Sequence, residues 1–167
     1  MRRSYTKKIA DAAMLTASAL IFSYVESLIP ITAGIPGIKL GLANLIVLTG
    51  IYFLPYTEVL FLLITRILLS SFLFGNLFSL FYSLSGGILS FLSMLLFKQL
   101  KGFTVTGVSI IGGISHNIGQ LICASLVLKT LHIMYYAPVL ILSGAVAGTL
   151  IGLTGSKCLT ILRKYRS

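Results

Sequence analysis

The chain has 167 residues, of which 57% are hydrophobic and only 10% are charged. Soluble domains carry roughly 25% charged residues, so the composition excludes a water-soluble fold and indicates a protein that is dissolved in a lipid bilayer. The net charge of +10 does not indicate a nucleic-acid-binding protein, because Lys and Arg gather at the chain ends and in short loops, as membrane topology requires.

Six apolar segments predict an all-α integral membrane bundle of six transmembrane helices, forming a single domain over residues 1–167. The segments are residues 9–28, 40–54, 59–74, 77–97, 105–128 and 137–162, and Pro30 and Pro55 end the first two. A helix needs about 20 residues to cross the hydrocarbon core. The second and third segments are therefore short, and we expect the second to be tilted, partial or buried among its neighbours.

The positive charges predict that both termini are inside the cell (N-in/C-in), in a multi-pass protein of the bacterial plasma membrane. Lys39 and Lys129 then lie outside and Arg66 lies within the membrane. The other ten positive residues fall on the cytoplasmic side: Arg2, Arg3, Lys7, Lys8, Lys98, Lys101, Lys157, Arg163, Lys164 and Arg166. The long outer loop, residues 30–39, is either a lid over the outer face or a plain connector.

Polar side chains within the apolar segments are the candidates for a binding site, because an ionisable group at the centre of a membrane helix costs about 2.5–3.5 kcal/mol. In the predicted topology they lie in the outer half or near the midplane. His116 and Gln120 are four residues apart and share a helix face. We expect an outward-facing cavity that binds a small molecule through Glu26, Lys39, Asn44, Arg66, Tyr82, His116, Asn117 and Gln120.

Lys39 and Arg66 suit an anionic or carbonyl-bearing ligand. Two structural alternatives stay open for the same residues. Glu26 and Arg66 can form a buried ion pair, and the polar residues of the fifth segment can be hydrogen-bonded contacts between helices.

Small residues at a four-residue period predict close helix packing. Gly144, Gly148 and Gly152 form one such series in the last segment. Ala13 and Ala17 form another pair near the cytoplasmic end of the first segment, where they serve either packing within the bundle or docking of a partner membrane subunit.

Several motifs together resemble one bacterial membrane family. They are PGIKLGLAN (residues 36–44), Arg66, the pair FG (74–75), YSLSGG (82–87) and SHNIGQ (115–120). The chain resembles the proteins named heptaprenyl diphosphate synthase component I, also called Gx transporters.

This resemblance implies the fold of the S components of energy-coupling-factor (ECF) vitamin transporters. S components capture a substrate from outside and dock on a membrane coupling subunit driven by two cytoplasmic ATPases. The Ala13-x-x-x-Ala17 pair resembles the small-residue docking motif of S components.

The scarcity of acidic residues argues against catalysis. Prenyl elongation needs Asp-rich clusters that hold Mg²⁺ on a diphosphate, whereas this chain has three acidic residues in total. No phosphate-binding loop, catalytic triad or zinc spacing is evident, so we expect no enzyme activity, cofactor or metal.

The leading hypothesis is a substrate-binding subunit of an ECF-type importer. The alternatives are a non-catalytic accessory component of heptaprenyl diphosphate or quinone synthesis, and a self-sufficient secondary carrier that uses His116 or Glu26 as its proton site.

Overall fold

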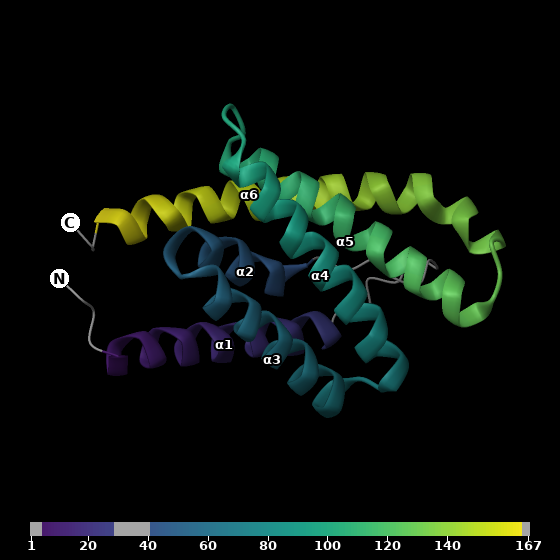
Figure 1. Cartoon of the computed structure of the whole chain (residues 1–167), viewed down its shortest axis with the longest axis horizontal. Coiled ribbons are helices and arrows are strands. Elements are labelled where there is room, and N and C mark those ends of the chain that lie inside the picture. The colour runs from purple at the N-terminus through teal and green to yellow at the C-terminus, as the bar shows by residue number, and fades with distance from the viewer. Residues whose placement is uncertain (1–4, 29–40, 165–167) are drawn as a thin grey trace.

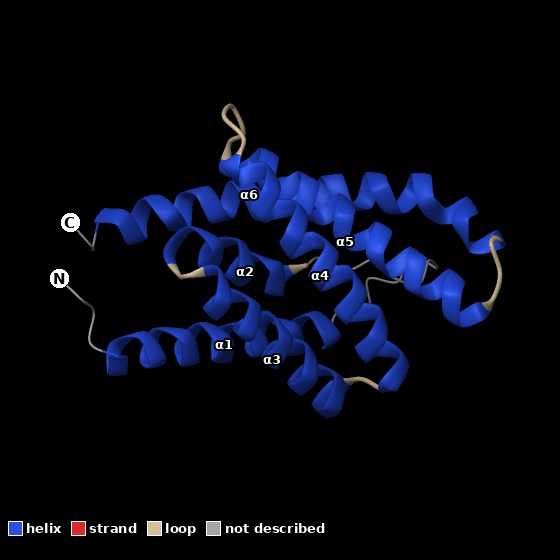
Figure 2. Cartoon of the chain, in the orientation of Figure 1, coloured by secondary structure: helices blue, strands red, loops and turns tan. Residues whose placement is uncertain are grey.

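Six α-helices account for most of the computed structural model, which describes residues 5–28 and 41–164 (Figure 1). Within these ranges no strand is present, and short loops join the helices (Figure 2). The helices are α1 (Tyr5–Leu28), α2 (Leu42–Phe53), α3 (Tyr56–Phe74), α4 (Leu77–Gln99), α5 (Val105–Leu128) and α6 (Ala137–Lys164), with a 3₁₀-helix, η1 (His132–Tyr136), before α6.

Local capping explains where several helices begin. Pro55 precedes α3, and its fixed φ suits a helix start. The Asn76 side chain caps α4 by accepting a hydrogen bond from Ser79 N at 2.8 Å, and Thr104 Oγ1 caps α5 by accepting one from Gly107 N at 3.1 Å. These side chains satisfy backbone donors that have no partner inside the helix.

Four helical stretches are long and apolar enough to cross a membrane: α3, α4, α5, and η1 together with α6 up to Leu162. The described apolar parts of α1, Ala12–Leu28, and of α2 are shorter. The chain is therefore a helical membrane protein. Six crossings and the N-in/C-in orientation stay predictions, although the start of α1 and the end of α6 do lie at the same end of the molecule (Figure 1).

The second segment is short and buried, as we expected. With 12 residues at 1.5 Å each, α2 is about 18 Å long, well below the ~30 Å of the hydrocarbon core. Half of its residues, including Val47, Leu48 and Ile51, are buried, and they pack into the core with Leu62 and Ile67 of α3. The helix is thus an internal element of the bundle.

Glycines bring α5 and α6 into backbone contact. A Cβ atom added to Gly148 would lie 2.7 Å from Ile110 Cα, and one added to Gly152 would lie 2.6 Å from Thr106 Cα. Gly113 and Gly144 face each other in the same way. The prediction that the Gly144, Gly148 and Gly152 series packs inside the bundle is confirmed.

Candidate ligand-binding site

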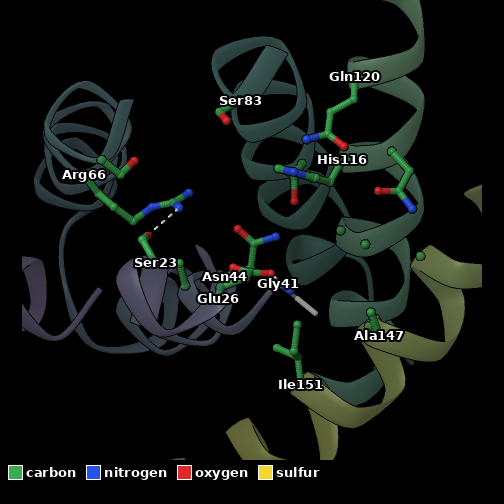
Figure 3. A pocket seen from close by; sticks show the side chains of 18 of the residues that line it. Ser23, Glu26, Gly41, Asn44, Arg66, Ser83, His116, Gln120, Ala147 and Ile151 are labelled. Atoms are coloured by element: carbon green, nitrogen blue, oxygen red, sulfur yellow. Dashed lines mark hydrogen bonds between the residues drawn. The ribbon is translucent and has the colours of Figure 1, made fainter. Parts of the chain in front are cut away.

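A cavity lies among the helices, and residues from all six of them line it. Its volume is about 130 Å³, roughly ten times the space that one water molecule requires. Figure 3 shows Asn44 of α2, Arg66 of α3, and His116 and Gln120 of α5 pointing into this common space. The other polar lining residues include Ser23, Glu26, Ser70, Ser83, Ser90 and Asn117.

Arg66 is the buried cation of the site. Its side chain is only 8% exposed, and Nη1 donates a long hydrogen bond, 3.4 Å, to Ser23 Oγ of α1 (Figure 3). Nε has no hydrogen-bond partner among the described residues. A buried charge needs compensation by an opposite charge or by several hydrogen bonds, and the described residues give the guanidinium a hydrogen bond to a neutral hydroxyl.

Glu26 is the acidic residue among the described residues that line the cavity. It bonds to the backbone and not to Arg66. Its Oε1 accepts a hydrogen bond from the N–H of Gly41, the residue that precedes α2. Gly41 has φ of 71°, in the left-handed region that favours glycine. The charge of Glu26 lies within electrostatic reach of Arg66. In the described structure, however, the two side chains form no direct ion pair.

The α4–α5 wall carries two further polar atoms without a partner in the described part of the chain. They are Gln120 Nε2 and Ser90 Oγ, on side chains that are 1% and 2% exposed. Glycine makes this wall possible, since a Cβ on Gly86 would lie 2.7 Å from Gln120 Cγ and 2.8 Å from the backbone oxygen of His116. The close helix approach therefore brings Gln120 and His116 to the cavity.

Asn117 joins α5 to α6. Its Nδ2 donates to Leu140 O at 2.6 Å and to Ser143 Oγ at 3.1 Å, both on α6. The interpretation as a hydrogen-bonded contact between helices is thus confirmed for Asn117, which also lines the cavity.

Six of the residues predicted from the sequence meet at the cavity: Glu26, Asn44, Arg66, His116, Asn117 and Gln120. Tyr82 does not line it, which corrects the prediction for this residue. Its ring stacks on Phe78 with 5.8 Å between the centroids. Lys39 lies outside the described residues. Whether the remaining residues bind a ligand stays a prediction.

Ser23, Ser83 and Ser90 also line the cavity but were not predicted. Helical spacing was the available signal, because Ser23 precedes Glu26 by three residues, and Ser83 and Ser90 are two helical turns apart on one face of α4. A serine by itself is a weak indication of a binding site, since serine is common in membrane helices.

The residues predicted to dock a partner subunit are not buried by packing within the bundle. Ala13 and Ala17 are both exposed on α1, whereas Ala19 is fully buried. A role for them in docking stays a prediction. Among the described residues, no group of three or more His, Cys, Asp or Glu side chains could hold a metal ion.

Comparison with protein families matches residues 15–158 to the family described as heptaprenyl diphosphate synthase component I. The chain belongs to this family. The matched range includes every residue that lines the cavity, and it confirms the resemblance that the sequence motifs indicated. Comparisons with curated proteins and with solved structures give no match.

Proposed function

We propose that this component I protein is the membrane-embedded substrate-binding subunit of an ECF-type importer, and that it captures a small molecule in the cavity between its helices. One observation carries the proposal. Arg66, Gln120 and Ser90 are each more than nine-tenths buried, line the same cavity and have a polar atom without a partner in the described part of the chain. Such atoms are costly inside a membrane protein, and a ligand that bonds to them offsets that cost.

The remaining parts of the proposal rest on the sequence. The protein lies in the bacterial cell membrane with both termini in the cytoplasm, and its cavity opens outward. A membrane coupling subunit docks on α1 at Ala13 and Ala17, which are exposed, and cytoplasmic ATPases drive the cycle. The chain itself is not an enzyme, since Asp11, Glu26 and Glu58 are its only acidic residues and form no paired carboxylate motif.

A second candidate function has its own support. The family description names a synthase component, which favours a non-catalytic accessory role beside a prenyl diphosphate synthase. That role predicts co-purification with a prenyltransferase. A self-sufficient carrier, the third possibility, predicts uptake into liposomes that contain this chain alone.

Gentle affinity purification from native membranes, followed by native mass spectrometry, tests the proposal. The importer predicts a retained small molecule together with a coupling subunit and ATPases. We expect Arg66→Met and Gln120→Leu to lose the retained molecule, while the matched control Tyr82→Phe keeps it. Recovery of a prenyltransferase without ATPases would reject the importer. Unchanged retention in both cavity variants would reject the site.

A further inference from the structure

The start of α2 faces the cavity. Gly41, Ala43 and Asn44 all line it. The N-cap residue of the 12-residue α2, Gly41, has no side chain to cap the helix, although the Asn44 N–H donates to Gly41 O at 2.8 Å. The first backbone N–H groups of a helix have no partner inside it, and the helix dipole places the equivalent of about half a positive charge there. A helix start of this kind favours a negatively charged group.

Buried side chains supply an independent indication of the same chemistry. Arg66 Nε and Gln120 Nε2 are both hydrogen-bond donors that lack an acceptor among the described residues. Arg66 also carries a full positive charge, and among the described residues its side chain donates to the neutral Ser23 hydroxyl. These two donors and the positive charge of Arg66 favour a ligand group that accepts hydrogen bonds and carries negative charge, whereas a cationic ligand would be repelled by Arg66.

Glu26 already occupies one part of this donor-rich region. Its carboxylate accepts the hydrogen bond from Gly41 N at the start of α2. Among the described lining residues, Glu26 is the one that carries a negative charge. Its hydrogen bond goes to the backbone and not to the guanidinium of Arg66. Glu26 thus holds the position at the helix start that a ligand anion would favour.

We propose that the cavity recognises an anionic group of its ligand, a carboxylate or a phosphate, through Arg66, Gln120 and the start of α2, and that this group competes with the Glu26 carboxylate. The inference rests on the proposed function and names the substrate class. A neutral Gln at position 26 removes the charge repulsion and weakens the competition, because its amide oxygen is a poorer acceptor than a carboxylate. A neutral residue at position 66 removes the main attraction.

Binding of four matched probes to the purified full-length protein in detergent tests this. Benzoate and phenyl phosphate carry the two anions, benzamide is a neutral analogue and benzylamine a cation. We expect only the two anions to raise the thermal unfolding midpoint, and the stronger of them identifies the anion. Arg66→Gln should weaken that binding roughly tenfold or more, as expected when a charged hydrogen bond is lost. Glu26→Gln should strengthen it by up to roughly tenfold.

Gln120→Leu provides a second weakened variant if Arg66→Gln does not fold, and Tyr82→Phe, outside the cavity, should bind like the unmodified protein. Benzamide or benzylamine binding as tightly as the anions would overturn the inference. Weaker anion binding in Glu26→Gln, or no binding of either anion, would overturn it as well. Native mass spectrometry separates the two proposals, since a retained neutral or cationic molecule would leave the proposed function standing while excluding the anion site.

Discussion

Replacing Gly148 with alanine tests the glycine contact between α5 and α6 directly. The added Cβ would lie 2.7 Å from Ile110 Cα and 2.7 Å from Ser109 O, both backbone atoms, whereas ordinary contact begins at 3.4 Å. The helices would have to separate by roughly 0.7 Å, and no side chain can rotate to relieve the contact.

The expected destabilisation follows from two opposing effects. Overpacking costs about 1–3 kcal/mol, and a backbone contact belongs at the upper end of that range. The better helix propensity of alanine returns about 1 kcal/mol. We therefore expect Gly148→Ala to lower the free energy of unfolding by about 2 kcal/mol, or the thermal midpoint by roughly 4–8 °C.

Native cysteines provide the assay, and a second glycine provides the control. Cys123 of α5 and Cys158 of α6 are free and partly buried, so a thiol-reactive fluorescent dye reports unfolding on heating. Gly107→Ala, also on α5, places its Cβ 3.5 Å from Phe103 Cδ1 in ordinary contact and should not lower the midpoint. If Gly148→Ala unfolds at or above the temperature of Gly107→Ala, glycine is not required at this helix contact.

Three further substitutions test other contacts. Lys98→Met removes a 2.6 Å hydrogen bond to Ile51 O and should destabilise the protein by about 1–3 kcal/mol in the same dye assay. Lys98→Arg should destabilise it less. If Lys98→Met unfolds at the same temperature as the unmodified protein, the contact is not stabilising. Asn117→Ala removes two bonds to α6 and should cost a similar ~1–3 kcal/mol, which an unchanged midpoint would contradict. Ala17→Leu, at an exposed position, should leave the thermal unfolding midpoint unchanged. The variant should no longer co-purify with the coupling subunit that the proposed function expects, and retention of that subunit would exclude docking at Ala17.

Helix positions follow largely from the apolar segments. Residues 105–128 were predicted as one segment and form α5 with the same bounds, because Thr104 caps its start and the polar Lys129 follows its end. The third segment was predicted to begin at residue 59, but α3 begins at Tyr56, since Pro55 favours a helix start whatever the hydropathy of the next turn. The turn η1 carries no comparable pattern and was not predicted.

Rotation of a helix about its own axis is harder to predict, and Tyr82 shows why. Gly87 packs against Ile67 of α3, where an added Cβ would lie 2.8 Å from Ile67 Cδ1. Ser83 and Ser90 lie four residues before and three residues after Gly87, so they share its face and line the cavity. Tyr82 precedes this face by one position. The sequence shows that both faces of α4 carry polar groups, but only the glycine contacts determine which face turns inward.

The same contacts link the stability of the protein to its proposed function. Gly86 lets α4 and α5 pack closely at Gln120, and Arg66 donates a hydrogen bond to Ser23 of α1. Arg66 Nε and Gln120 Nε2 have no acceptor among the described residues, and a buried donor without an acceptor lowers stability. Under the proposed function, a ligand that accepts from these donors would bind the folded state alone, and at a hundred times its Kd it would add about 2.7 kcal/mol of stability. Occupancy of the cavity and resistance to unfolding should consequently rise together.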